Sequence, residues 1–179
     1  MSADKMNLRD SQAPLRSLYK TSPRAAWVTD HARTQGDATD PFHSTVAPAP
    51  EFGVTIPVGV HRAIGGPHDA PTPGDILCAA LAACQDSAIR IVANLLGVEL
   101  ESITVEVSGD VDVRGAMAVA KDIPVGFQSM QCNVRIGVKE GTSPELLEKL
   151  QVNAERCCLV LQTLRAGVPV EAAFNVTAV

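Results

Sequence analysis

The sequence has 179 residues, a length typical of one domain with or without an extending arm. Hydrophobic residues make up 46%, which excludes disorder throughout, and with aromatic residues at only 3% we expect a core of Val, Leu, Ile and Ala. A formal net charge of -5 argues against binding nucleic acid through its phosphates. No uninterrupted apolar run reaches the ~18 residues of a membrane span, and the first residues lack a signal-peptide layout. We therefore expect a cytoplasmic protein with reduced thiols and no membrane partner.

The N-terminal part, residues 1–70, differs in composition from the rest, since nine of the twelve prolines lie at or before Pro73. We expect short strands and long loops there. Three segments are candidate strands: 18–20, 26–29 and 54–58. Such a part buries little apolar surface alone, so we expect it to add strands to a larger sheet or to wrap a partner subunit, within one domain that also includes residues 71–179.

The pattern becomes sharper at the start of the second part. Thr72 can cap a helix, Pro73 suits its first position and Asp75 its third, so we expect a helix to begin here. A stretch rich in Ala, Leu and Ile continues to Gly97, a typical helix stop. Because this helix is apolar on most sides over residues 76–83, we expect it to be deeply buried there.

Two alternating segments follow, each typical of a half-buried strand. Apolar residues occupy every second position over residues 103–107 and again over 130–138. A second helix is expected over residues 143–164, ended by Gly167, with a last strand over roughly 168–176. The chain thus reads as α+β, with a mostly antiparallel sheet and two long helices, at least one of them central.

Five cysteines, an odd number in a chain expected to be reduced, do not suit a disulfide-stapled scaffold. There is no Cys-x-x-Cys pair and the four histidines show no ligand spacing, so we expect no metal and no cofactor. Cys78 and Cys84 point about 120° apart on one helix, and vicinal disulfides are rare, so pairing between helices is favoured. Cys78 and Cys132 occupy apolar positions typical of packing, whereas Cys84, Cys157 and Cys158 stay open between packing and chemistry.

Two cysteine-bearing segments resemble those of the OsmC/Ohr family, the osmotically inducible and organic-hydroperoxide-resistance proteins. Residues 70–84, APTPGDILCAALAAC, are similar to the family's central helix, where a Pro and an acid precede an aliphatic pair and Ala-Ala-x-x-Ala-Cys. Residues 155–164, ERCCLVLQTL, look like the second motif, Cys-Pro-Val followed by a Leu. Cys158 takes the aligned place, with Leu159 where Pro is common. The resemblance covers roughly residues 70–176.

The resemblance implies an OsmC-like fold, with curved antiparallel sheets around two long central helices and two subunits intertwined into a homodimer with active sites at the interface. It also implies a thiol peroxidase that reduces organic (alkyl or lipid) hydroperoxides in defence against oxidative stress. Cys84 would attack the peroxide as a thiolate, and Cys158 would resolve the sulfenic acid into a disulfide. A dithiol such as a lipoylated protein would then reduce that disulfide.

In the peroxidases of this family an Arg–Glu pair activates the thiolate, and this chain departs from that pattern. The glutamate position is Gly74, and Asp75 stands nine residues before Cys84, about 13.5 Å along a helix, so it could act only through an arginine. Asp75 also reads as the acid of a capping box. Arg33 is the most similar to the family's early arginine, although a surface charge is the alternative. Two other arginines compete with it: Arg24 and Arg62.

Two classes of function therefore remain open. One is the peroxidase; the other is a non-catalytic protein that keeps the fold and binds a small hydrophobic ligand in the apolar pocket of the dimer interface. The reactivity of Cys84 distinguishes them. A different enzyme activity in the same pocket ranks last, because no Ser/His/Asp arrangement has usable spacing.

Overall fold

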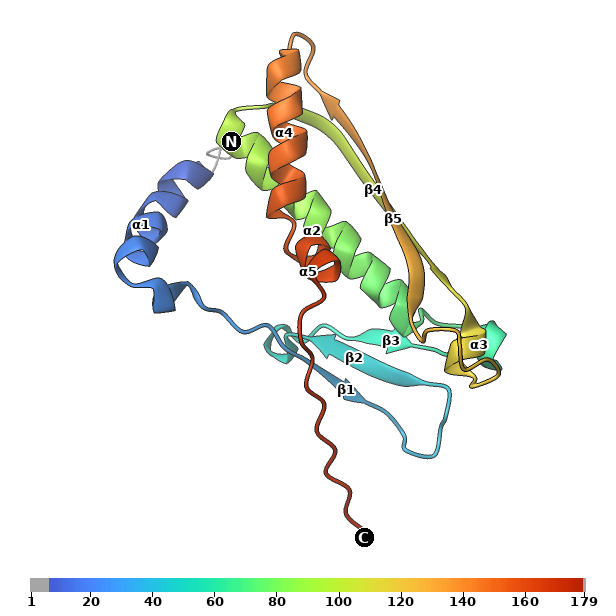
Figure 1. Ribbon diagram of the computed structural model, residues 1–179. Coiled ribbons are helices and arrows are strands. Elements are labelled where there is room, and N and C mark those ends of the chain that lie inside the picture. Colours follow the sequence, from blue (N-terminus) through green and yellow to red (C-terminus); the bar gives the residue numbers. More distant parts are fainter. Residues whose placement is uncertain (1–6, 179) are drawn as a thin grey trace.

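The computed structural model describes residues 7–178 and confirms the α+β class (Figure 1). Its main elements, in chain order, are α1 (Leu8–Thr21), β1 (Ala32–Gln35), β2 (Ser44–Pro48), β3 (Ile56–Val58), α2 (Pro73–Leu96), β4 (Leu100–Val111), α3 (Val113–Ala116), β5 (Phe127–Val138), α4 (Pro144–Cys157) and α5 (Leu159–Ala166). Short 3-10 turns lie between α1 and β1, β2 and β3, and β3 and α2. α2 is the central element and packs against α1, β4, α4 and α5.

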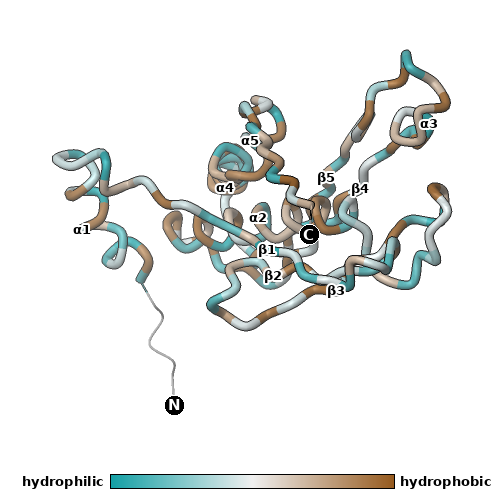
Figure 2. The backbone as a smooth tube through the Cα atoms, turned by 90° about the horizontal axis from the view of Figure 1, so that it is seen from below, coloured by the Kyte–Doolittle hydropathy of each residue, from teal (hydrophilic) through white to brown (hydrophobic). Residues whose placement is uncertain are grey.

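The described strands form two antiparallel sheets. The N-terminal sheet has the order β1-β2-β3 and lies near the start of α2 (Figures 1 and 2). The second sheet is a long hairpin in which Leu100 of β4 pairs with Val138 of β5 at one end, and Val111 pairs with Phe127 at the other. The expected alternation holds in β4, and in β5 it holds at Met130, Cys132, Ile136 and Val138 but not at Val134, which is exposed. The other inward positions pack on the two core clusters described below. The hairpin, α2 and α4 enclose the core.

α2 begins and ends where its sequence predicts. The Thr72 hydroxyl accepts a hydrogen bond from the Asp75 N–H, and the Asp75 carboxylate accepts bonds from the Thr72 N–H and O–H, which closes a capping box. Gly97 ends the helix at a φ of 72°, the left-handed conformation that favours glycine. The second half of α2 packs against α4 and the hairpin in what we name the aliphatic cluster: Ile89, Val92, Ala93, Val98, Leu150 and Ala154.

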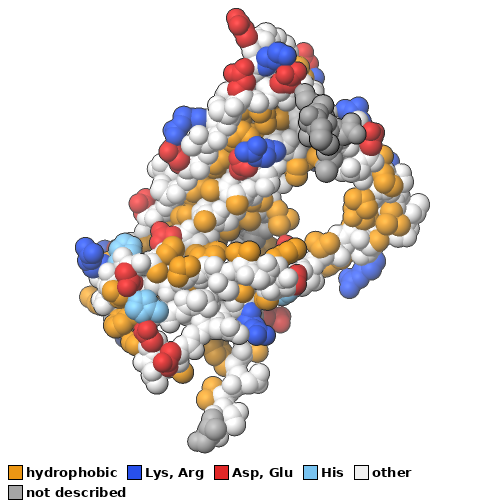
Figure 3. Space-filling view, turned by 180° about the vertical axis from the view of Figure 1, so that it is seen from behind, with side chains coloured by type: hydrophobic (Ala, Val, Ile, Leu, Met, Phe, Trp, Pro, Cys, Tyr) orange, Lys and Arg blue, Asp and Glu red, His pale blue; other side chains and the backbone are white. Residues whose placement is uncertain are grey.

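The first half of α2 is less buried than expected. Within residues 76–83 only Leu81 is buried, while Ala79, Ala80 and Ala83 are exposed. The second half of the helix is covered by α4 and β4, whereas the other elements of this single chain leave part of the first half exposed. Figure 3 shows the molecule from behind, and apolar side chains gather across the middle of this face. By length and composition α2 could cross a membrane, which is weak evidence because core helices pass the same test.

The expected second helix is in fact two helices. α4 ends at Cys157 and α5 begins at Leu159, and Cys158 between them is extended, with φ -73° and ψ 101°. The expectation was wrong because neither glycine nor proline marks the break, Leu159 standing where the family commonly has proline. Gly167 ends α5 as predicted.

The N-terminal part was predicted only in places. Residues 18–20 belong to α1 rather than to a strand, because Leu15, Leu18 and Tyr19 recur at helical spacing and Asn7 caps the helix by accepting the Arg9 N–H. Residue 26 ends a 3-10 turn, and residues 27–29 have no regular secondary structure. Of the three candidate segments only 54–58 contains a strand, which is β3. Strands β1 and β2 were missed.

The last expected strand, over residues 168–176, is also corrected. These residues have no secondary structure and are exposed, with Val170 86% and Phe174 87% accessible. A strand exists only where a neighbouring strand accepts and donates its backbone hydrogen bonds, and within the described chain none lies beside this segment. The alternating sequence is therefore available for pairing that one chain does not supply.

Candidate active site

The two cysteines of the family motifs come together, each from its own helix. Leu81, Ala88 and Cys158 form a buried group against which Cys84 and Cys132 pack, and we name these five residues the thiol cluster. Cys158 is fully buried, whereas Cys84 and Cys132 are half-buried. Other partly buried side chains surround it: Val107, Met130, Val160 and Leu161. α2, β5 and the α4–α5 junction thus each contribute one thiol to one apolar site.

The start of α5 is directed at the Cys84 sulfur. The backbone N–H of Val160 donates a hydrogen bond to Cys84 Sγ with an N···S distance of 3.4 Å. Val160 is the second residue of α5, so this N–H has no partner within the helix, and the partial positive charge of the helix start favours negative charge on the sulfur. In an unbroken helix the same N–H would bond to the carbonyl of Arg156. The break at Cys158 therefore creates the donor.

Cys158 has the opposite environment. The pKa of the Cys158 thiol is raised to about 11, chiefly by burial. The backbone N–H of Leu161 acts in the opposite direction, and a hydrogen bond to Cys84 and the nearby Cys84 and Cys132 sulfurs add smaller increases that are part of this value. At neutral pH Cys158 is consequently a thiol that can donate its proton toward Cys84. The two sulfurs thus have different surroundings: Cys84 Sγ accepts a backbone hydrogen bond from the start of α5, whereas Cys158 is held as a buried thiol.

The residues proposed to activate the thiolate lie elsewhere. Asp75 bonds to Thr72 in the capping box, and these hydrogen bonds hold the pKa of its carboxyl below the ordinary value. Arg33 is exposed on β1, and its side chain makes no hydrogen bond or ion pair with the residues at 7–178. No such bond joins either residue to Cys84 or Cys158 within that range. Their catalytic roles stay predictions.

Two carboxylates near the motifs form ion pairs. Asp86, two residues after Cys84, forms an ion pair with Arg90 at 2.7 Å. Glu155 forms one with Arg165, also at 2.7 Å. Each carboxylate therefore has a cationic partner of its own, and neither is left to oppose a thiolate.

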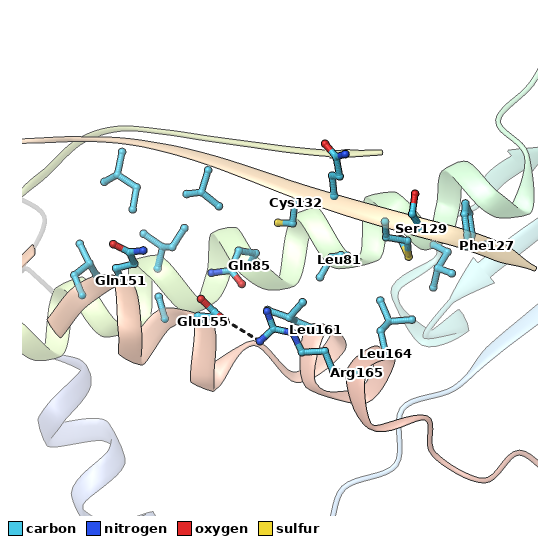
Figure 4. A pocket seen from close by; sticks show the side chains of 18 of the residues that line it. Leu81, Gln85, Phe127, Ser129, Cys132, Gln151, Glu155, Leu161, Leu164 and Arg165 are labelled. Atoms are coloured by element: carbon cyan, nitrogen blue, oxygen red, sulfur yellow. Dashed lines mark hydrogen bonds and ion pairs between the residues drawn. The ribbon is translucent and has the colours of Figure 1, made fainter. Parts of the chain in front are cut away.

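An open cavity of about 1020 Å³ lies between β5, α2, α4 and α5 (Figure 4). Most of its lining is apolar, and of the five cysteines only Cys132 is part of it. Gln85 projects into it from α2, only 5% exposed, and its Oε1 has no hydrogen-bond partner. The Glu155–Arg165 ion pair lies at its edge. A buried acceptor without a donor marks a place where a polar group of a ligand could bind.

Sequence reasoning assigned no binding role to Gln85 and did not predict that Cys132 opens onto this cavity. The available signal was a polar residue, Gln85, directly after Cys84 on an otherwise apolar helix. A second cavity of about 1080 Å³ lies at the start of α2 beside Asp75 and Cys78. Burial and the Asp75 charge raise the pKa of Cys78, which makes it a poor nucleophile. Among residues 7–178 no group of three or more His, Cys, Asp or Glu side chains could hold a metal ion.

Comparison with known proteins agrees with this architecture. The OsmC-like protein of unknown function from Vibrio cholerae is 14% identical, with a TM-score of 0.62 over 76% of this chain and 94% of that one. The organic hydroperoxide resistance protein OsmC from Legionella pneumophila is 23% identical, with a TM-score of 0.58 over 78% and 91%. An organic hydroperoxide resistance protein from Elizabethkingia anophelis is 19% identical, with a TM-score of 0.57 over 78% and 90%.

At these low identities, the TM-scores show a shared fold. No curated protein matches the sequence. The family described as OsmC-like protein matches residues 66–173, more than half of the chain and the part that contains α2, the hairpin and the α4–α5 junction. This chain therefore belongs to the OsmC-like protein family.

Proposed function

We propose that this protein is a thiol peroxidase that reduces organic hydroperoxides, with Cys84 as the attacking residue and Cys158 as the resolving residue. The observation that carries the proposal is the hydrogen bond from the Val160 N–H to Cys84 Sγ beside the buried Cys158 thiol. The similarity in fold to organic hydroperoxide resistance proteins supports the same substrate class.

The first step is attack by the Cys84 thiolate on the terminal oxygen of the hydroperoxide. The S–O bond forms as the O–O bond breaks, Cys84 becomes a sulfenic acid, and the alkoxide leaves and takes a proton to become the alcohol. Two donors stabilise the starting thiolate: the Val160 N–H and the Cys158 S–H. In this chain the start of α5 supplies part of the stabilisation that an arginine supplies elsewhere in the family.

The second step is resolution. Cys158 attacks the sulfenic sulfur of Cys84, a disulfide forms and water leaves. The negative charge of Cys84 is one of the causes that raise the pKa of Cys158, and oxidation of Cys84 removes this charge. Cys158 thus stays protonated while Cys84 attacks and becomes more acidic once Cys84 is oxidised. A dithiol, such as a lipoylated protein, returns the disulfide to two thiols.

The proposal includes an intertwined homodimer in the cytoplasm. The half-covered start of α2 and the unpaired segment 168–176 are surfaces that a second copy could cover. Residues 1–70 contribute the N-terminal sheet to this assembly, in one domain with residues 71–179. Arg33 is the proposed additional donor to the thiolate, with Asp75 as its carboxylate partner. Comparing peroxide consumption by Arg33→Ala and Arg24→Ala, which removes another exposed arginine, tests that role.

The second candidate function is the binding of a small hydrophobic ligand without catalysis. It is favoured by one observation, the unpartnered Gln85 Oε1 in a largely apolar cavity. A bound molecule with an apolar body and one N–H or O–H donor would satisfy both features.

The test is consumption of cumene hydroperoxide with a dithiol as reductant, by the wild type, Cys84→Ser and Cys78→Ser. Cys78 is the matched control because it is another half-buried cysteine on α2 outside the thiol cluster. We expect Cys84→Ser to lose consumption and Cys78→Ser to retain it. A wild type no faster than Cys84→Ser contradicts the peroxidase and leaves the binding function.

A further inference from the structure

We infer that Cys132 is a third redox thiol. It displaces Cys84 from the Cys84–Cys158 disulfide, and the resulting Cys132–Cys158 disulfide is accessible to the reductant through the cavity. This inference rests on the proposed function, because that function supplies the first disulfide. It adds a residue that neither cysteine motif contains, and it changes the role of Cys132 from packing to chemistry.

The first argument is position. Cys132 lies on β5 in the same alternating phase as Met130, and both pack on the buried group that contains Cys158. The Cys132 sulfur is close enough to Cys158 that its charge contributes to the raised pKa of that thiol. Cys78, by contrast, lies outside the thiol cluster. Three thiols from three elements therefore share one site, with Cys158 interacting with each of the other two.

The second argument is access. Cys158 has no exposed surface, and Cys84 is half-buried with its sulfur bonded to the start of α5. A disulfide between them lies inside the apolar cluster, where a reductant must reach it in line with the S–S bond. Cys132 lines the cavity of about 1020 Å³ (Figure 4), so a disulfide that includes Cys132 has one sulfur facing open space.

The step is an ordinary thiol–disulfide exchange. Burial raises the pKa of the Cys132 thiol, so the exchange proceeds through the small fraction of Cys132 that has lost its proton to solvent through the cavity. That thiolate attacks Cys158 Sγ, the Cys132–Cys158 bond forms and the Cys84–Cys158 bond breaks. Cys84 leaves as a thiolate and regains the hydrogen bond from the Val160 N–H, which makes it a good leaving group. No electrons are gained or lost in this exchange.

Reduction then occurs at the exposed sulfur. One thiol of the external dithiol attacks Cys132 Sγ and releases Cys158, and its second thiol attacks the mixed disulfide and releases Cys132. The dithiol leaves as a disulfide. Meanwhile Cys84 is already a thiolate and ready for the next peroxide.

The first experiment isolates the pair. Cys84→Ala is oxidised with diamide, free thiols are trapped with N-ethylmaleimide, and the linked peptides are identified by mass spectrometry. We expect a Cys132–Cys158 disulfide that is absent from the double variant Cys84→Ala/Cys132→Ala. Cys158 that remains alkylated, or that links to Cys157 instead, overturns the inference.

The second experiment measures reduction in the otherwise complete protein. Cys132→Ala and Cys78→Ala are oxidised with cumene hydroperoxide, and the return of free thiol after adding dithiothreitol is followed. We expect reduction to be roughly tenfold slower in Cys132→Ala than in Cys78→Ala. Equal rates overturn the relay. A wild type that consumes no peroxide while the first experiment yields the Cys132–Cys158 link refutes the proposed function but leaves the thiol pair standing.

Discussion

The two clusters along α2 use the same helix in different ways. The aliphatic cluster at its second half is covered on several sides by α4 and the hairpin. The thiol cluster at its middle is covered by the junction of α4 and α5, where the chain breaks and turns a helix start toward a sulfur. Burial in the first region stabilises the fold, whereas in the second it sets the protonation of thiols. Mutations should therefore separate stability from reactivity.

The largest effect is expected in the aliphatic cluster. Leu150 is 2% exposed, so Leu150→Ala should leave a cavity and lower the free energy of unfolding by about 2–5 kcal/mol. Val152→Ala is the control, because Val152 on the same helix is 59% exposed. Urea denaturation measures both. Equal losses in the two variants would show that this cluster is not the core.

The next effect depends on pH. Because the folded protein raises the pKa of Cys158 to about 11, it binds the Cys158 proton more tightly than the unfolded chain, whose thiol has a value near 9.0. This stabilisation is complete below pH 9 and is lost as the pH rises toward 11, by on the order of 2 kcal/mol. Urea denaturation from pH 8 to 11 should show a steeper loss in the wild type than in Cys158→Ala. If the free energy of unfolding falls with pH equally in the wild type and in Cys158→Ala, the raised pKa of Cys158 is refuted.

The third prediction concerns reactivity without a change in fold. Val160→Pro removes the N–H that bonds to Cys84 Sγ, at a helix position where proline is tolerated. One such bond is worth about 1 kcal/mol, so alkylation of Cys84 by iodoacetamide at pH 7 should slow roughly fivefold.

Leu159→Pro is the matched control for this change. It places proline one residue earlier, after the extended Cys158 and at the first position of α5, where the backbone suits it. Leu159 is 66% exposed. We expect Cys84 in this variant to be alkylated at the wild-type rate. A fivefold lower alkylation rate in Leu159→Pro as well would mean that proline disturbs the α4–α5 junction, and that the effect of Val160→Pro is not due to the loss of one donor.

The smallest effect is expected at the capping box. Asp75→Asn should lower the free energy of unfolding by about 0.5–1 kcal/mol at neutral pH. Because Thr72 lowers the pKa of Asp75, the contribution is present above the unfolded value near 3.8 and disappears as the pH falls through the folded one. Thermal unfolding from pH 7 to 3 checks this, with Asp122→Asn at an exposed aspartate as the control. A stability difference between the wild type and Asp75→Asn that grows as the pH falls would contradict this prediction.

Local signals were enough for part of the fold. The cap at Thr72, the stop at Gly97 and the alternation of β4 and β5 are properties of neighbouring residues, and all three were predicted correctly. β1 was missed because a fully exposed strand of four residues carries no alternation of burial, and β2 because its five residues include only a short partly buried pattern that ends in proline. Residues 168–176 were predicted as a strand from alternation, yet a strand also needs a neighbour, which sequence does not show.

The sequence by itself determined the family, the central helix and the two cysteine motifs, because each depends on residue types at fixed local spacing. The tertiary structure decided what surrounds each sulfur. It broke the second helix at Cys158 without a glycine or proline, freed the Val160 N–H for Cys84, buried Cys158 and opened Cys132 onto a cavity. These features depend on packing between residues far apart in the chain, and the protonation of a thiol follows from that packing.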